Sequence, residues 1–393
     1  MAIEQCGRAW RSWRRRLHGA VVAVLRSPPP VSLGPLAEAR ATGNPLSDAY
    51  GWLVARKRSR DTARAVRISP PDVPVLSVGN VTFGATGKTP CVLLLVELAL
   101  KLSRSNRVPM LLSRGYGDDE WRMLAAKFPA CELAIGSDRV AVGARRVAEC
   151  GGSASLSCVV VDDGLQQWSI PRDLELVMMD ALYPVGNGRL MPCGSLRERP
   201  SDALARADVV VLHHAELVPH ETLARLETAV AKWLDPARKP IIATSRVKLL
   251  GLPLYRDVLG TTLSTGDDWE SSCSGRVALI VCGVGNPESV RLVVEKSLST
   301  WLHVEMAAYP DHHSFSHMDM VDVQRLCAQL RHRWGQEVVV LTTEKDLSRS
   351  PVELQTLADT EELRVIRAEM ELNRNAEAVV ARVAALLDHR SSN

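Results

Sequence analysis

The 393-residue sequence lacks several features that would assign it to a common class. None of its nine cysteines forms a Cys-x-x-Cys pair, which excludes the usual zinc-site spacing and a small disulfide scaffold and suits a reducing compartment. No window holds the ~20 consecutive apolar residues that a bilayer-spanning helix needs, so we do not expect a transmembrane protein. The net charge of +3 is too small to argue for nucleic acid as a partner. Without internal repeats or low-complexity tracts, this length predicts two domains and a terminal appendage.

The N-terminal segment, residues 1–30, differs from the rest in composition. It is rich in arginine, and Glu4 is its only acid. On a helical wheel one apolar stripe collects Trp10, Trp13, Leu17, Val21 and Val24. This pattern is typical of an amphipathic helix that lies on a membrane surface. A cleaved organellar transit peptide and a helix packed on the protein's own surface remain alternatives, and the prolines at 28–30 end the helix in each case.

The most informative segment spans residues 78–90 and reads V-G-N-V-T-F-G-A-T-G-K-T-P. It follows a short apolar run and precedes a helix-like segment, which is the layout of a nucleotide phosphate cradle. Glycines let the backbone approach phosphates, and the free N–H groups of a helix N-terminus point at them. The predicted ATP-binding residues are Gly84, Thr86, Gly87, Lys88 and Thr89. Lys88 would reach the β- and γ-phosphates and the Thr89 hydroxyl would hold Mg²⁺. The strict pattern has glycine where Thr82 stands, and a glycine-rich turn with an incidental lysine is the alternative.

From residue 73 onward, apolar runs alternate with amphipathic stretches. The predicted parallel strands are 74–78, 108–112, 158–162, 174–180, 208–212 and 240–244, and the predicted helices are 88–103, 138–150, 200–207 and 220–233. This order predicts a doubly wound α/β sheet of the P-loop NTPase type in a core domain, residues 31–270. A polar stretch near 270 is followed by a smaller C-terminal α/β domain, residues 271–393. Its predicted elements are strands 276–282, 302–307 and 337–342 and helices 287–298, 319–334 and 375–388.

Two adjacent acids, Asp162 and Asp163, end the apolar strand 158–162. A P-loop protein needs a carboxylate at the end of a neighbouring strand to hold hydrated Mg²⁺. The sequence therefore predicts that both aspartates serve the metal and its waters, although adjacent acids at a strand end can also cap a turn.

Further charged or glycine-rich clusters follow other predicted strands. They lie at 113–120, 136–139, 190–199, 309–313 and 342–346. Any one of them alone is typical of a solvated loop. Because open α/β sheets bind ligands at the carboxyl ends of their strands, the clusters together indicate one site.

These motifs, taken in order, resemble the tetraacyldisaccharide 4′-kinase family, the lipid A 4′-kinases. The resemblance runs from about Tyr50 to the C-terminus, and that family also spaces its glycines as Thr-x-Gly-x-Thr-Gly-Lys-Thr. It implies a kinase that transfers the γ-phosphate of ATP to the 4′-hydroxyl of tetraacyldisaccharide 1-phosphate, with a C-terminal domain closing over the nucleotide. It also implies peripheral attachment at the cytoplasmic face of a bacterial inner membrane, or a mitochondrion or other organelle if the source is eukaryotic.

The resemblance assigns roles to individual residues. It implies Asp119 as the catalytic base and His312 as its partner, with Lys88 on the triphosphate. The residues it implies at the substrate are Glu120, Arg139, Arg197 and Glu198. Arg114 and Lys345 either stabilise the transferring phosphate or bind the substrate's own phosphate. The family's Gly-Asp-Glu-Pro segment reads Asp-Asp-Glu-Trp at 118–121, and Leu165 replaces an aromatic. We expect His313 to cap a turn.

Two other functions use the same motifs. A P-loop switch that hydrolyses nucleotide to move a partner should carry an Asn-Lys-x-Asp guanine reader, and the nearest segment is Thr-Glu-Lys-Asp at 343–346. A membrane-tethered scaffold would have a degenerate nucleotide site, whereas Lys88, Thr89 and both aspartates are present.

Overall fold

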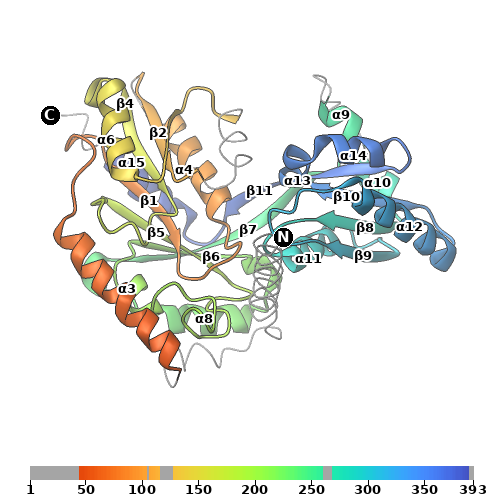
Figure 1. Ribbon diagram of the computed structural model, residues 1–393, viewed down its shortest axis with the longest axis horizontal. Helices are drawn as coiled ribbons and strands as arrows, with labels where there is room; N and C mark the ends of the chain where they lie inside the picture. The colour runs from red at the N-terminus through yellow and green to blue at the C-terminus, as the bar shows by residue number, and fades with distance from the viewer. Residues whose placement is uncertain (1–43, 104–105, 116–126, 260–267, 389–393) are drawn as a thin grey trace, which may run out of the picture.

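The computed structural model describes residues 44–103, 106–115, 127–259 and 268–388 (Figure 1). The predicted N-terminal helix over 1–30 and the predicted site residues Asp119 and Glu120 lie outside the described residues.

Eleven strands of the described chain form one sheet in the order β3-β2-β4-β1-β5-β6-β7-β11-β10-β8-β9. Their bounds are β1 (Val75–Asn80), β2 (Val108–Ser113), β3 (Glu132–Ile135), β4 (Leu156–Asp162), β5 (Leu174–Asp180), β6 (Val209–His213), β7 (Ile241–Gly251), β8 (Val277–Cys282), β9 (His303–Ala308), β10 (Val338–Thr343) and β11 (Leu363–Leu372). Among these strands only β7 and β11 pair antiparallel. The predicted parallel α/β sheet is confirmed.

The helices of the described residues fill the connections between strands. They are α3 (Pro45–Ala63), α4 (Lys88–Leu102), α6 (Arg139–Glu149), α7 (Pro200–Leu204), α8 (His220–Ala231), α9 (Tyr255–Leu259), α10 (Trp269–Cys273), α11 (Pro287–Ser297), α12 (His317–Trp334), α13 (Glu344–Arg349), α14 (Pro351–Ala358) and α15 (Ala376–Asp388). The predicted helices and strands all form, and most end within a few residues of their expected ends. The exception is β7, which runs on from the expected strand at 240–244 to Gly251. The elements α3, β3, α9, α10, α13, α14 and β11 were not predicted.

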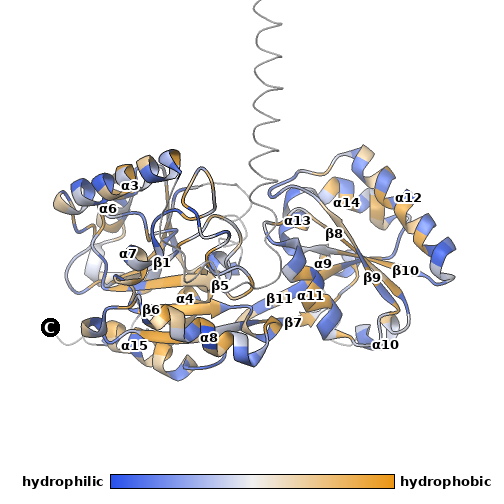
Figure 2. Ribbon diagram, turned by 90° about the horizontal axis from the view of Figure 1, so that it is seen from below, coloured by the Kyte–Doolittle hydropathy of each residue, from blue (hydrophilic) through white to orange (hydrophobic). Residues whose placement is uncertain are grey.

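Helices cover both faces of the sheet in the half that contains the P-loop. Alternate residues of β1 show this, since Leu76 and Val78 pack with α4 and α15 whereas Val75 packs on the side of α6. Further along the same half, α7 and α8 cover β5 and β6 on the face opposite α4. The strands are apolar along much of their length, as their colour in Figure 2 shows, because each is enclosed on two sides. Because β1 pairs parallel with both β4 and β5, the carboxyl ends of these three strands lie together at one end of the sheet.

The two halves are joined by β7 and β11, which run side by side between them (Figure 1). The start of β7 pairs with β6, and the start of β11 pairs with β10, while their later residues pair with each other. The helix expected near 375–388 forms as α15, but its placement in the second α/β unit was wrong. Its buried residues pack in the same core as α4 because β11 leads the chain back to the first half. The division at 270 stays a prediction.

The second half repeats the layered arrangement on a smaller scale. One face of β8 and β10 packs against α12 and α14, and the other packs against α10 and α11. No helix of the described chain is long and apolar enough to cross a bilayer.

Candidate active site

The P-loop leads from β1 into α4 with two glycines in the left-handed region, Gly84 at φ 112° and Gly87 at φ 82°. Gly87 is the N-cap of α4, so no side chain caps this helix, and its first turn contains no acid. The free N–H groups and the positive end of the helix dipole therefore remain open to an anion. Lys88 is the first helical residue, and Thr89 follows it. The loop has the geometry of a phosphate cradle.

Asn80 holds this loop in shape. The buried amide Nδ2 of Asn80 donates to the carbonyl of Thr82 at 2.6 Å and to Oγ1 of Thr86 at 2.9 Å. Gly79 is required beside it, because a Cβ there would lie 2.4 Å from the Cβ of Leu165. These contacts keep Thr86 inside the loop, where its hydroxyl is committed to Asn80 and its backbone is left for a ligand.

The segment 195–197 pairs with the start of the P-loop. Phe83 donates its N–H to the carbonyl of Ser195 at 2.7 Å, and Arg197 donates its N–H to the carbonyl of Val81 at 2.8 Å. The Arg197 guanidinium then lies 4.4 Å from the centre of the Phe83 ring and donates to Oδ1 of Asp163 at 2.6 Å. Backbone pairing thus places a fixed positive charge beside the cradle, and the predicted contact of Arg197 with substrate stays a prediction.

The two aspartates lie at the same edge because β4 is the neighbour of β1, with Asp162 opposite Val78. Oδ2 of Asp162 accepts from Oγ of Ser113 at 3.1 Å. Oδ1 of Asp163 lies 3.8 Å from Nζ of Lys88. Burial alone would raise the pKa of the Asp163 carboxyl, but Arg197 and Lys88 outweigh it and hold that pKa below its usual value. Asp163 is therefore ionised at neutral pH.

Arg139 lies beneath this carboxylate loop and is 7% exposed. One guanidinium nitrogen donates to the carbonyls of Asp162 and Asp163 at 2.8 and 3.0 Å, and the other donates to Oε1 of Gln167 at 2.9 Å. The described contacts of Arg139 therefore hold the backbone that presents the two acids, and its predicted contact with substrate is untested.

Glu198, predicted at the substrate, is 1% exposed and lies within a charged network. Its carboxylate accepts from Arg206 at 2.9 Å and from Nε2 of Gln166 at 3.0 Å, and Arg58 of α3 lies 3.5 Å away. Sequence reasoning gave Gln166 no role, yet its amide also donates to the Asn80 carbonyl and accepts from Arg197. Gln166 links the P-loop, Arg197 and Glu198, and its place three residues after Asp163 was the signal that could have identified it.

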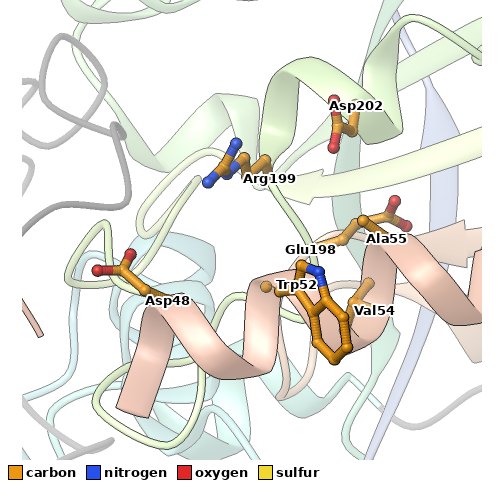
Figure 3. A pocket seen from close by; sticks show the side chains of 8 residues that line it. Asp48, Trp52, Val54, Ala55, Glu198, Arg199 and Asp202 are labelled. Carbon is orange, nitrogen blue, oxygen red and sulfur yellow. The ribbon is translucent and has the colours of Figure 1, made fainter. Parts of the chain in front are cut away.

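A cavity of about 230 Å³ opens on the α3 side of Glu198 (Figure 3). It is lined by Asp48, Gly51, Trp52, Val54, Ala55, Glu198, Arg199 and Asp202. Glu198 is thus one wall of this cavity, and the α3 residues Asp48, Trp52 and Ala55 form part of another.

His312 follows β9 and has a left-handed backbone, φ 59°. Its N–H donates to the Gly283 carbonyl, and Arg349 lies 3.4 Å from its ring Nδ1 through Nη2. Because an arginine can only donate, this contact leaves the ring proton of a neutral His312 on Nε2. Half of the side chain is exposed. Arg349 on α13 was not predicted at the site, since nothing in its local sequence distinguishes it from other surface arginines.

The remaining candidates are His313, Arg114 and Lys345. Nε2 of His313 lies 3.1 Å from Oδ2 of Asp319, the acid of the α12 capping box, and the expected turn cap by His313 stays a prediction. Arg114 is exposed directly after β2, and Lys345 lies on α13. The structure thus brings the P-loop, both aspartates, Arg139 and Arg197 together at one edge, and it places His312 on the facing half.

The donor set suits Mg²⁺. Thr89, Asp162 and Asp163 offer only oxygen, the ligand that hard divalent cations prefer. Among the residues that the structure describes, no group of three His, Cys, Asp or Glu side chains could hold a metal by itself.

Comparison with known proteins identifies relatives over most of the chain. The family model described as "Tetraacyldisaccharide-1-P 4'-kinase" matches residues 39–388. The Arabidopsis thaliana protein "Probable tetraacyldisaccharide 4'-kinase, mitochondrial" is 31% identical over 83% of this chain and 85% of its own. A "Tetraacyldisaccharide 4'-kinase" of Halothermothrix orenii is 31% identical over 77% and 80%, and one of Anaeromyxobacter sp. is 30% identical over 95% and 94%.

A solved structure has the same fold. It is LpxK from Aquifex aeolicus in complex with ATP, with a TM-score of 0.55 and 22% identity over 87% of this chain and 98% of that chain. Family model and relatives together show that the chain belongs to the tetraacyldisaccharide 4′-kinase family.

Proposed function

We propose that this protein transfers the γ-phosphate of ATP to the 4′-hydroxyl of tetraacyldisaccharide 1-phosphate, a step of lipid A biosynthesis. The observation that carries the proposal is the meeting of Lys88, at the uncapped start of α4, with Asp163 and Arg197 at one sheet edge. Family membership supplies the substrate class. Family membership also favours a kinase over a switch or a scaffold.

The triphosphate would lie along the P-loop, with its charge balanced by Lys88, Arg197 and the N-terminus of α4. Thr89, Asp162 and Asp163 would hold Mg²⁺, which would supply positive charge against the charge of the transferring phosphate. Arg139 and Gln166 would keep the carboxylates and Arg197 in register. Catalysis here is mainly positioning and charge stabilisation, as in other phosphoryl transfers.

The acceptor hydroxyl is a weak nucleophile and needs a base within hydrogen-bond reach. We assign that role to Asp119 with His312 as partner, and Asp119 lies outside the described residues. Arg349 supports this assignment because its contact with Nδ1 of His312 keeps a proton on Nε2, where it can be donated to a carboxylate. Glu120 and Arg114 would bind the substrate near this pair.

Attachment at a membrane surface would bring the enzyme to its glycolipid. The predicted helix at 1–30 is the first candidate, and α3 supplies a second. Exposed apolar side chains on α3 are Leu46, Trp52 and Leu53, and the basic residues Arg56 and Arg60 follow them on its exposed surface. An apolar and basic helix surface suits the lipid interface. We place the protein at the cytoplasmic face of a bacterial inner membrane, or in a mitochondrion or other organelle if the source is eukaryotic; a relative from Arabidopsis is named mitochondrial.

The test is transfer of labelled γ-phosphate from ATP to tetraacyldisaccharide 1-phosphate in detergent micelles, with and without Mg²⁺. The parent protein should form bis-phosphorylated lipid, and Asp119→Ala should form little. Chelation should abolish transfer, and added Mg²⁺ should restore it. ATP hydrolysis without lipid product would instead support the switch.

Membrane attachment is tested separately by flotation with anionic liposomes. Deletion of 1–27 should reduce the floated fraction while ATP binding persists. Equal flotation of both proteins would reject the N-terminal segment as the attachment site.

A further inference from the structure

Asp180 ends β5 at the same sheet edge as the P-loop, and the proposed mechanism does not use it. It is 4% exposed. Its Oδ1 accepts from the N–H of Leu182 at 3.0 Å and lies 3.0 Å from Nδ1 of His214. Its Oδ2 accepts from Nδ2 of Asn286 at 2.8 Å. The carboxylate therefore links two segments that are far apart in sequence, one in each half of the molecule.

The two linked segments both touch the P-loop. His213, the neighbour of His214, lies against Gly87, where an added Cβ would be 2.5 Å from the imidazole carbon Cδ2. Gly285, the neighbour of Asn286, lies against Ala85, and a Cβ there would be 3.1 Å from the Ala85 Cβ. A buried imidazole ring thus lies against Gly87, and a loop of the opposite half lies against Ala85.

The orientation of the Asn286 amide is fixed by its other bond. Its Oδ1 caps α11 by accepting from the N–H of Ser289 at 3.1 Å, so its Nδ2 must face Asp180. An amide that donates to a buried carboxylate forms a charge-assisted hydrogen bond, which is stronger than a neutral one. The contact is directional, and it is specific for an acid on one side and an amide on the other.

We propose that Asp180 and Asn286 are positioning residues for ATP binding, because their hydrogen bond sets the spacing between the two segments that lie against Gly87 and Ala85 of the P-loop. Neither residue is among those assigned above to ATP, Mg²⁺ or the glycolipid. They act through His213 and Gly285, whose distances to the loop determine whether its N–H groups can converge on phosphates.

Exchange of the two side chains tests the proposal on the full-length enzyme. Asn286→Asp alone places two carboxylates in contact, and Asp180→Asn alone places two amide donors in contact. Each should raise the KM for ATP, and the Kd for ATP by calorimetry, about tenfold, with the KM for the glycolipid changed less than twofold. The double variant Asp180→Asn/Asn286→Asp restores an acid–amide pair with reversed direction. It should return the KM for ATP to within about threefold of the parent.

A matched control is Asp268→Asn. Asp268 is the N-cap of α10, and its carboxylate accepts a hydrogen bond from the N–H of Ser271. The substitution therefore removes a carboxylate from a helix N-cap far from the P-loop in sequence. It should leave both KM values unchanged. Thermal unfolding of every variant separates folding from positioning. Single variants with lowered Tm but a normal KM for ATP, or a double variant as impaired as the singles, would overturn the proposal.

Discussion

Nζ of Lys88 lies 3.8 Å from Oδ1 of Asp163, so the lysine of the phosphate cradle faces the acid of the neighbouring strand. The same carboxylate oxygen accepts from Arg197 at 2.6 Å. The Asp163 carboxylate thus pairs with both Lys88 and Arg197, two cations that can bind phosphate, and holds them beside the P-loop.

Replacement of Lys88 by methionine should lower the kcat of lipid phosphorylation by on the order of 10²-fold or more, because a preorganised charge at the transferring phosphate is lost. The measurement is labelled phosphate transfer at saturating ATP. Lys101→Met is the control, since Lys101 lies on the same helix, is exposed and pairs with Glu97 one helical turn away. If the Lys88→Met variant kept near-parental turnover, the assignment of residues 82–89 as the ATP phosphate-binding loop would be rejected.

Arg197→Lys should lower kcat/KM about tenfold, although the charge is kept. A lysine cannot donate to Asp163 and Gln166 from one planar group while lying over the Phe83 ring. Steady-state kinetics with both substrates measure the change. Arg325→Lys, at an exposed pair on α12 with Asp322, should change kcat/KM less than twofold. Equal behaviour of the two variants would contradict the geometry described for Arg197.

Gly87→Ala should abolish ATP binding, since its Cβ would enter the His213 ring at a backbone φ of 82°. Gly275→Ala provides the control because Gly275 has a similar φ of 72° and nothing within 4 Å. Both variants should lose about 1 kcal/mol of stability from the left-handed backbone. Only Gly87→Ala should lose nucleotide affinity, measured by calorimetry. Retained affinity would show that the loop can move away from His213.

The pH dependence of folding should reflect His213. Burial and the adjacent His214 hold the pKa of His213 well below 6.5, so the unfolded chain takes up a proton at this position that the folded protein excludes. Its contribution to stability is complete above pH 6.5 and is lost as the pH falls from 6.5 towards the folded-state pKa. The loss amounts to at most about 1.4 kcal/mol per pH unit.

Urea unfolding between pH 7.5 and 5 measures this slope. His213→Asn should flatten it, whereas His332→Asn, at an exposed position of α12, should not. An unchanged slope in His213→Asn would mean that other groups dominate acid destabilisation.

Most of the parallel sheet, and the P-loop at the carboxyl ends of its strands, could be predicted from the sequence. Enclosed strands are continuous apolar runs, and glycines mark the phosphate cradle. The sequence did not reveal the strand β11 or the second part of β7. There apolar and polar residues alternate, as in Arg246-Val247-Lys248, because the ribbon between the halves is half exposed. A search for unbroken apolar runs stops at residue 244 for this reason.

The same distinction between local and long-range signals applies to the candidate site. Lys88 and Asp163 could be proposed from the sequence because local spacing defines the motifs that contain them. Gln166, Arg349 and Asp180 act through partners that lie far away in sequence, and only the fold brings those partners together. The burial of Glu198 was equally invisible, since its three cationic or amide partners come from separate segments.

The return of the chain through β11 to α15 has a consequence for how the protein can be cut. The chain leaves the first half through β7, forms β8, β9 and β10, and returns through β11, so the second half is an insertion in the sequence of the first. Truncation from the C-terminus would therefore strip Val379, Val383 and Leu387 from the core beneath the P-loop before it removed any of the second half. A shortened protein is better obtained by excising the insert and joining β7 directly to β11 with a hairpin turn.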